Sequence, residues 1–276
     1  MTTLPRRAAA SAPPLLRARS LRGLPWLGHG FSTRRSGRRG QDFDLRVSAR
    51  NQHRFTRAVL GPRADLLTLK QVHSALIWRD PEPQKSGDAM MTDAPGRLLA
   101  IKTADCVPIL LVDVRRRAVS AVHAGWRGTL ARIAEKTVGE MRAAFGTEPT
   151  SLRAVIGPSI RGCCYEVGEE VHHAFCAQFA YGESLFLDAE DDPVRNRYPM
   201  LFMTGAPPGH PYDPRWNPTQ PHRLDLAAAN LRQLVDAGIA QAAVEILPFC
   251  TACHPERFFS HRHGAAGRML SGIGIL

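Results

Sequence analysis

Three apolar runs occupy the centre of the chain and predict its most deeply buried strands. They span residues 98–102, 107–112 and 118–122, and each is short, rich in aliphatic residues and bounded by polar ones. Such runs are typical of strands that are covered on both faces. A polar break separates the first two runs, and a glycine-flanked turn follows the third. The pattern therefore predicts a buried sheet whose strand ends carry polar side chains.

The other periodicities predict further strands and several helices in mixed order. Apolar stripes at helical spacing, together with capping residues such as Thr129 and Asp225, mark the helices. We expect helices over 51–60, 129–145, 169–179 and 225–236, and further strands over 24–33, 66–72, 75–78, 154–156, 243–247, 258–262 and 269–276. Because strands and helices do not alternate strictly, this order predicts an α/β fold with mixed, α+β-like sheets.

Composition narrows the class of protein. The chain of 276 residues is 44% hydrophobic and 22% charged, which is ordinary for a soluble globular protein. No run approaches the roughly 20 apolar residues that cross a bilayer, so we expect no membrane contact. The length allows a substantial core in one large domain or two small ones.

The formal net charge of +11 belongs to the amino-terminal region. Residues 1–63 hold fourteen Arg against two Asp, whereas the remainder holds 22 basic and 23 acidic residues. We interpret residues 1–22 as a disordered basic extension, with a targeting peptide or a nucleic-acid arm as alternatives. Pro13 and Pro14 interrupt the apolar stretch that an export signal needs, so a cytoplasmic protein is expected. In that compartment the six cysteines are thiols or metal ligands rather than disulfides.

Three side chains at strand ends form the leading candidate site. His73 follows the run 66–72, Cys106 lies in the polar break, and His123 follows the third central run. Two imidazoles and a thiolate suit zinc, whose catalytic sites keep three protein ligands and one position for water or substrate. Spacings of 33 and 17 residues match no zinc finger. The alternative is a buried core thiol beside two hydrogen-bonded histidines.

A second candidate is the turn at 123–128, which leads into a predicted helix. Free N–H groups at such a turn favour anions, and Arg127 is placed to bind a phosphate or carboxylate with two hydrogen bonds. The alternative is a glycine turn with a surface arginine.

The remaining cysteines give weaker signals. Residues 250–254 read Cys-Thr-Ala-Cys-His, which matches the attachment motif of c-type haem, but haem attachment requires export. A structural metal at Cys250 and Cys253 is an alternative, but no second close pair exists to complete it. The adjacent Cys163 and Cys164 are not expected to point easily at one site. We therefore interpret these residues as packed thiols.

Several ordered motifs resemble one known family. They are Lys-Gln-Val-His at 70–73, Asp-Ala-Met-Met-Thr at 88–92, Thr-Ala-Asp-Cys-Val-Pro at 103–108, His-Ala-Gly-Trp-Arg-Gly at 123–128, Ile-Gly-Pro at 156–158, Cys-Tyr-Glu-Val-Gly at 164–168, Phe-Phe-Ser-His-Arg at 258–262 and Gly-Arg-Met at 267–269. Together they resemble the laccase-domain, or polyphenol oxidase, family, whose members are described as purine nucleoside phosphorylases. The resemblance runs from about Gly30 to the carboxyl end.

The resemblance implies a fold, a metal and an activity. The implied fold is a single domain over 23–276, a layered α/β/β/α sandwich like the catalytic domain of the cytotoxic necrotizing factor toxins. The implied metal is zinc, or copper, on His73, Cys106 and His123. The implied activity is phosphorolysis of adenosine, inosine, guanosine and methylthioadenosine, with adenosine deamination in addition. The Pro-rich stretch 183–221 is unfamiliar in the family, and we expect a lid or a mobile insertion there.

Further site residues are predicted within the motifs. Besides Cys106 itself, the candidate catalytic residues are Asp105, expected to orient a metal ligand, and Glu166, expected to hold the base or move a proton. The candidate substrate and phosphate contacts are Arg34, Lys70, Arg127 and Arg262. The sequence departs from the family around 35–52, which weakens the contacts expected from that region.

Three other functions stand against the phosphorylase and deaminase hypothesis. A multicopper phenol oxidase needs about ten histidines in clustered pairs, whereas this chain has eleven in total and only His261 and His263 at that spacing. A hydrolase that acts on cell-wall precursors would use Cys106 as a nucleophile. A nucleic-acid-binding role would depend on the basic arm and is disfavoured. The expected partners are a purine nucleoside and phosphate, and the expected state is a monomer or a weak homo-oligomer.

Overall fold

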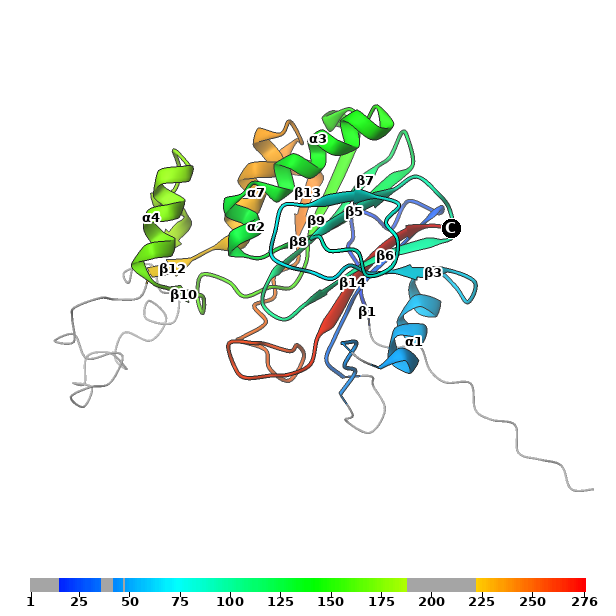
Figure 1. Cartoon of the computed structure of the whole chain (residues 1–276), viewed down its shortest axis with the longest axis horizontal. Coiled ribbons are helices and arrows are strands. Elements are labelled where there is room, and N and C mark those ends of the chain that lie inside the picture. The colour runs from blue at the N-terminus through cyan, green and yellow to red at the C-terminus, as the bar shows by residue number, and fades with distance from the viewer. Residues whose placement is uncertain (1–14, 36–41, 47, 188–221) are drawn as a thin grey trace, which may run out of the picture.

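Two sheets pack face to face in the computed structural model, with helices on both outer faces (Figure 1). The structure describes residues 15–35, 42–46, 48–187 and 222–276. The six-stranded sheet has the order β13-β9-β7-β8-β5-β4, with β13 at Val244–Ile246, β9 at Leu152–Ile156, β7 at Val107–Asp113, β8 at Ala118–Ala124, β5 at Ala89–Thr92 and β4 at Ile77–Arg79.

The second sheet contains strands from both ends of the chain. Its order is β1-β2-β14-β6-β3, with β1 at Leu15–Leu16, β2 at Leu27–Ser32, β14 at Met269–Ile275, β6 at Arg97–Thr103 and β3 at Asp65–Leu67. A small third sheet has the order β10-β12-β11, with β10 at Glu166–Val167, β12 at His222–Leu224 and β11 at Phe186–Leu187.

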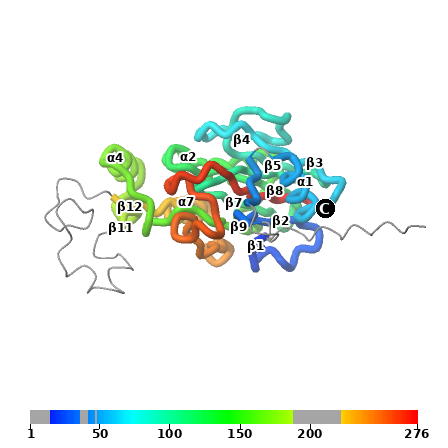
Figure 2. Tube along the Cα trace, turned by 90° about the horizontal axis from the view of Figure 1, so that it is seen from below, coloured from blue at the N-terminus to red at the C-terminus, as the bar shows by residue number. Residues whose placement is uncertain are grey.

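The helices cover the two outer faces. They are α1 at Ala49–Val59, α2 at Trp126–Leu130, α3 at Ile133–Phe145, α4 at Glu169–Gln178 and α7 at Leu226–Asp236, with short 3-10 turns η1 at Pro149–Ser151, η2 at Glu183–Leu185 and η4 at Gln241–Ala243. Helices α3 and α7 lie over the six-stranded sheet and α1 over the five-stranded sheet (Figure 1). Helix α4 and the small sheet lie at the end of the molecule opposite α1 in both views (Figure 2).

Side chains alternate between two covered faces along the central strands, which explains why the strands are mostly apolar. In β7, Ile109 and Leu111 face the helices, whereas Leu110 and Val112 enter the core between the two sheets. In β6, Leu99 faces the same inner core and Leu98 faces α1. Since both faces of each strand are covered, the side chains in the middle of each strand are buried.

The fold class and most elements agree with the sequence prediction. The prediction of a mixed α/β fold is confirmed, and the described residues form the predicted layers. Asp225 caps α7 as predicted, because its side chain accepts hydrogen bonds from two backbone N–H groups of the first turn. The likeness to the toxin catalytic domain stays a prediction. Within the described residues, no helix is both long and apolar enough to cross a membrane.

Four local predictions are corrected. Residues 129–145 form two helices, because Arg132 adopts a left-handed φ of 60° between them, and Thr129 is a buried hydrogen-bonding residue rather than a cap. The strand expected over 66–72 ends at Leu67. The strand expected over 258–262 is a series of turns.

The amino-terminal boundary also moves. Residues 15–22 belong to the fold, since β1 pairs with β2 and the side chains of Ala18 and Leu21 are buried. The predicted extension therefore ends earlier than residue 22, and residues 1–14 lie outside the described part of the chain. Most of the expected insertion, 188–221, lies outside it as well.

Candidate metal centre

The three predicted ligands come from three different segments that meet at one end of the six-stranded sheet, where β7 begins and β8 ends. His73 lies on the connection between β3 and β4, Cys106 immediately precedes β7, and His123 lies near the end of β8. The antiparallel register pairs Val107 with Ala124, which sets Cys106 beside the turn that follows β8. The pairing of buried strands thus positions two of the three side chains.

The three ligand atoms lie close enough to hold one ion. All lie within 4.8 Å of one another, and the Sγ of Cys106 is 3.8 Å from Nε2 of His73. The two imidazole rings meet edge to face with centroids 4.9 Å apart. His123 is buried, Cys106 is half-buried and His73 is exposed, so the triad of His73, Cys106 and His123 opens to solvent on the His73 side.

Asp88 supports two of the three ligands from behind. Its Oδ1 accepts a hydrogen bond from Nδ1 of His123 at 2.8 Å, which leaves Nε2 of that ring for an ion. The carboxylate also accepts the backbone N–H groups of Val72, His73 and Ser74, at 3.3, 3.0 and 2.6 Å. These bonds hold His73 in its left-handed conformation, with φ of 58°. A carboxylate that orients a metal-binding histidine is a usual partner in metal sites.

Gly125 leaves room for the triad. A Cβ added there would lie 2.8 Å from Cδ2 of His73 and 3.2 Å from the Sγ of Cys106. Any side chain at this turn would push the two ligands apart, so the close approach requires glycine.

In the metal-free site, the electrostatics favour a thiolate on Cys106 beside a protonated imidazole on His123. Burial disfavours the thiolate of Cys106, but the charge of His123 and hydrogen bonds from both histidines outweigh it and lower the pKa of Cys106 to about 6. Burial likewise opposes charge on His123, yet Cys106 and Asp88 raise the pKa of its imidazole to about 9. Burial raises the pKa of Asp88, and the hydrogen bonds from His123 and Ser74 overcome it and lower that pKa to about 2. A thiolate is the form of cysteine that binds metals.

Asp105 supports the segment that carries Cys106. Its backbone has a left-handed φ of 89°, and its side chain is buried. Its carboxylate accepts hydrogen bonds from the hydroxyl groups of Thr251 at 2.6 Å and Ser260 at 3.1 Å, and from the backbone N–H of Arg262 at 2.8 Å. Because these bonds occupy both oxygens, Asp105 positions the chain around Cys106. Its predicted role as an orienting residue stays a prediction.

A phenol and two arginines lie around the site. The guanidinium of Arg262 lies over the ring of Tyr165, 5.4 Å from its centroid, and Arg127 stacks on Trp126 at 4.3 Å. Burial and then the charge of Cys106 raise the pKa of Tyr165, the charges of Arg262 and Arg127 lower it, and the result is about 12. Because the charges of Cys106, Arg262 and Arg127 all act on Tyr165, these side chains lie near one another.

The other predicted contacts have different partners. Arg34 pairs with Asp42 through two nitrogen atoms, at 2.9 and 3.2 Å, and its guanidinium also donates to the carbonyl of Pro255. The carboxylate of Glu166 lies 4.0 Å from the guanidinium of Arg223. Lys70 is exposed on the connection that leads to His73. The structure therefore brings Arg127 and Arg262 toward the triad and gives Arg34 and Glu166 ion-pair partners of their own.

Sequence reasoning did not single out Asp88, Tyr165 or Gly125 as site residues. A signal existed for Asp88, because an acidic residue directly precedes the buried strand β5 in a motif that the family shares. Tyr165 adjoins Glu166 in another such motif. In the sequence, Gly125 indicates a turn but not a contact with the triad.

The donor set fits a metal ion. Two imidazoles and a thiolate, one ring oriented by a carboxylate, are ligands that zinc prefers and that copper also accepts. The described residues contain two more groups with metal-ligand spacing, namely His172, Cys176 and Glu183 near α4, and a cluster of four cysteines.

Comparison with known proteins gives a family match over most of the chain. Residues 29–276 match the profile of the family described as multi-copper polyphenol oxidoreductase laccase. A purine nucleoside phosphorylase of Bacteroides thetaiotaomicron is 38% identical over 190 residues, which are 68% of this chain and 60% of that protein. The chain thus spans less than two thirds of the length of this relative.

Two further relatives align over more of their length. A purine nucleoside phosphorylase of Deinococcus radiodurans is 34% identical over 95% of this chain and 93% of its own. Adenosine deaminase RL5, from an unknown prokaryotic organism, is 34% identical over 85% of this chain and 76% of its own. Among solved structures, the hypothetical protein YfiH of Bacillus licheniformis superposes with a TM-score of 0.77 at 26% identity, covering 97% of this chain and 98% of that one.

Proposed function

We propose that this chain, which belongs to the multi-copper polyphenol oxidoreductase laccase family, is a zinc-dependent purine nucleoside phosphorylase. The observation that carries the proposal is the convergence of His73, Cys106 and His123 in front of Asp88, in a chain that aligns with two purine nucleoside phosphorylases. The proposed substrates are adenosine, inosine, guanosine and methylthioadenosine, with phosphate as the second substrate.

Phosphorolysis makes specific demands on the chain. A phosphate oxygen bonds to C1′ of the nucleoside, the bond from C1′ to N9 breaks, and N9 takes up a proton as the base leaves. Arg127 and Arg262 bind the phosphate through charge-assisted hydrogen bonds, which also stabilise the charge that moves in the transition state. Tyr165 keeps its proton at neutral pH, since burial raises its pKa to about 12, and it offers a hydrogen-bond donor beside these arginines.

The triad supplies the metal chemistry. Zinc bound by His73, Cys106 and His123 acts as a Lewis acid and lowers the pKa of water. In the metal-free site the charge of His123 outweighs burial and lowers the pKa of the Cys106 thiol to about 6, and His123 releases its proton when an ion binds, because only a neutral imidazole is a ligand. Asp88 holds the proton on Nδ1 of His123 and so keeps Nε2 available.

Adenosine deamination is a second activity proposed for the same site. The name of adenosine deaminase RL5, which is 34% identical, supports it. In this reaction water adds to C6 of the purine and ammonia leaves, which is chemistry that zinc sites in other deaminases perform. Cys106 and the two histidines serve both reactions as ligands.

The decisive experiment incubates the purified chain and adenosine with and without phosphate and separates the products by chromatography. We expect adenine and ribose 1-phosphate only when phosphate is present, and inosine and ammonia in its absence. Cys106→Ala should lower both rates by more than about 10³-fold, because it removes a metal ligand. Cys176→Ser, which removes a thiol near α4, is the matched control and should keep both activities.

Two results would contradict the proposal. Intact adenosine in the presence of protein that holds stoichiometric zinc would exclude the proposed substrates. Oxygen uptake with a phenol after copper loading, without phosphorolysis, would favour the copper phenol oxidase instead.

A further inference from the structure

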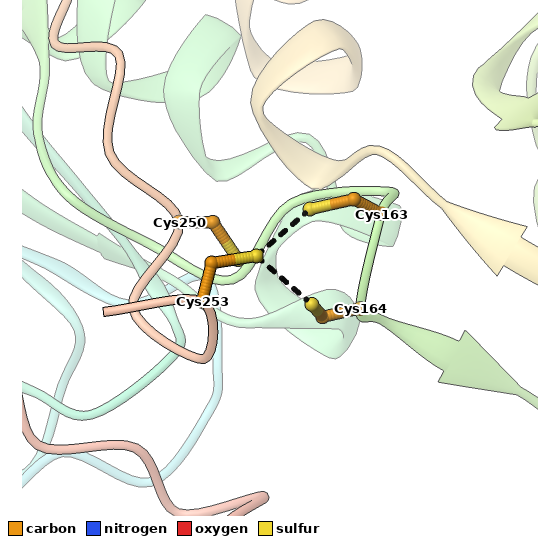
Figure 3. Close-up of side chains that lie close together, drawn as sticks. All are labelled: Cys163, Cys164, Cys250 and Cys253. Carbon is orange, nitrogen blue, oxygen red and sulfur yellow. Dashed lines mark hydrogen bonds between the residues drawn. The ribbon is translucent and has the colours of Figure 1, made fainter. Parts of the chain in front are cut away.

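Four cysteines from two distant loops meet outside the triad. Cys163 and Cys164 lie on the loop between β9 and β10, and Cys250 and Cys253 lie on the loop after β13 (Figure 3). Their sulfur atoms all lie within 4.8 Å of one another. The Sγ of Cys253 is 3.3 Å from that of Cys164 and 3.6 Å from that of Cys163.

This arrangement overturns the expectation that adjacent cysteines do not easily share a site. Successive side chains alternate in a strand, but residues 161–165 form a turn. In that turn, the N–H groups of Cys164 and Tyr165 both bond to the carbonyl of Arg161. The turn directs Cys163 and Cys164 toward the same point, and they are the second close pair that the sequence did not reveal.

The spacing of the sulfurs suits a tetrahedral ion. A zinc–sulfur bond of about 2.3 Å in a tetrahedron separates the sulfur atoms by about 3.8 Å. The measured separations of 3.3 and 3.6 Å are close to this value. A disulfide would use only two of the four sulfurs, whereas here each of the four faces the others (Figure 3).

Backbone donors and a nearby arginine favour negative charge on the sulfur of Cys250. The backbone N–H groups of Cys253 and Arg161 donate hydrogen bonds to the sulfur of Cys250. The half-buried guanidinium of Arg161 lies nearby, where its charge acts on Cys250 and Cys163, and it donates to the carbonyl of Leu247 at 2.7 Å. Such donors and a nearby positive charge offset the excess negative charge of a metal with four thiolates.

We propose that Cys163, Cys164, Cys250 and Cys253, here called the thiol cluster, bind one structural zinc ion. On binding, each thiol releases its proton to solvent and each sulfur forms one bond to zinc, with no change of oxidation state. Four sulfur ligands fill the tetrahedron, so this ion has no position for substrate. Soft thiolates in tetrahedral geometry select zinc over the harder divalent ions.

The ion would fix the two loops that support Asp105. Cys250 pairs with Ser159 across an isolated β-bridge, and the backbone N–H of Thr251 donates to the carbonyl of Ser159 at 3.0 Å. Thr251 also donates to the carboxylate of Asp105, and the N–H of Ile160 donates to the carbonyl of Asp105 at 2.9 Å. The thiol cluster therefore lies directly behind the segment that carries Cys106.

Metal analysis of the purified full-length chain, kept reduced and produced with added zinc, tests the proposal. We expect two zinc ions per chain in the wild type, one in Cys106→Ala, one in Cys253→Ser and none in the double variant. X-ray absorption of Cys106→Ala should show four sulfur ligands at about 2.3 Å and no nitrogen. In Cys106→Ala, the four thiols of the cluster should be protected from alkylation until a chelator removes the ion.

Several outcomes would overturn the assignment. One is a folded Cys106→Ala protein without zinc, and another is a disulfide between Cys164 and Cys253 in freshly isolated protein. Loss of the second zinc in Cys176→Ser would assign that ion to the group near α4 instead. Iron rather than zinc in Cys106→Ala would overturn the identity of the metal. All these readouts count metal and ligands, so they stay independent of whether adenosine is the substrate.

Discussion

The triad and the thiol cluster offer a metal ion two different ligand sets, and the contrast is the one expected between a reactive site and a supporting one. The triad has three ligands of two kinds, comes from the ends of two neighbouring strands and from one connection, and is exposed at His73. The thiol cluster has four ligands of one kind and comes from two loops. Catalytic zinc keeps an open coordination position, whereas structural zinc is closed by four protein ligands.

The two sites are also supported differently. Asp88 is fully buried behind the triad and bonds both to a ligand ring and to the backbone around His73. The thiol cluster depends on backbone N–H groups and on Arg161. A buried carboxylate tunes one ligand, whereas backbone donors compensate the charge of the cluster as a whole. Substitutions behind each site should therefore affect only that site.

Asp88→Asn should have the largest effect of the remaining predictions. The amide of Asn accepts hydrogen bonds only at its oxygen. It therefore cannot keep all the hydrogen bonds that the carboxylate accepts from Nδ1 of His123 and from the backbone N–H groups around His73. We expect a loss of about 10–100-fold in zinc affinity at the triad. A titration of metal-free Asp88→Asn against a competing chelator measures it.

Ser74→Ala is the matched control for this prediction. It removes a hydroxyl group that donates to Asp88 at 2.7 Å and leaves the contact with His123 intact. The zinc of the thiol cluster should stay unchanged in both variants. Equal weakening of the two zinc ions in Asp88→Asn would show that the sites are coupled and would end the contrast between them.

The central strands and the composition of the triad could be predicted because they follow from local pattern. Strands β6, β7 and β8 are covered on both faces, so their apolar runs are nearly continuous and their ends are sharp. The positions of His73, Cys106 and His123 at the ends of these runs suggested the triad, and the resemblance of the surrounding motifs to the family added the metal. Whether these residues bind metal stays a prediction, although the structure brings them together.

The missed features depend on contacts that the sequence does not show. The break at Arg132 is a left-handed residue without glycine, so no residue type marked it. Asp88 acquires its role only when β5 pairs with β8 and sets it beside His123. The thiol cluster requires a turn at 161–165 and a loop some 90 residues later to meet. The sequence predicts a strand over 258–262, but the segment turns around Asp105, which accepts hydrogen bonds from Ser260 and Arg262.

The scaffold has an acid sensitivity of its own, which must be separated from metal loss at either site. His29 in β2 is only 3% exposed, and its Nε2 accepts the backbone N–H of Ala18 at 3.0 Å. Burial and then the charge of Arg17 lower the pKa of His29 from 6.5 to about 4. The unfolded chain therefore binds this proton before the folded one does. The contribution of neutral His29 to the free energy of unfolding is fully present above pH 6.5, and it is lost as the pH falls toward 4.

Between pH 7.5 and 5 the loss from His29 should be about 2 kcal/mol in the free energy of unfolding. Denaturant unfolding of metal-free protein at the two pH values measures it. His29→Gln keeps an acceptor for Ala18 but does not titrate, so it should lose about 2 kcal/mol less than the wild type over this range. His53→Gln on the exposed face of α1 is the control and should behave as the wild type. An identical pH dependence in His29→Gln would assign the acid sensitivity to other groups.

Arg127→Gln should have the smallest effect, and it tests whether the triad side of the molecule is where phosphate binds. Arg127 is exposed beside the triad and stacks on Trp126, so its removal leaves the fold and both metal sites intact. At this exposed position, loss of one hydrogen bond should cost about 0.5–1.5 kcal/mol, which corresponds to an increase of about two- to tenfold in the KM for phosphate. The KM for adenosine should stay nearly constant, since the guanidinium binds the anion and not the base. Arg57→Gln, on α1 at the opposite face, removes the same charge far from the triad and should change neither constant. If both variants raised the KM for phosphate alike, the effect would come from overall charge, and the open side of the triad would lose its assignment as the place where phosphate binds.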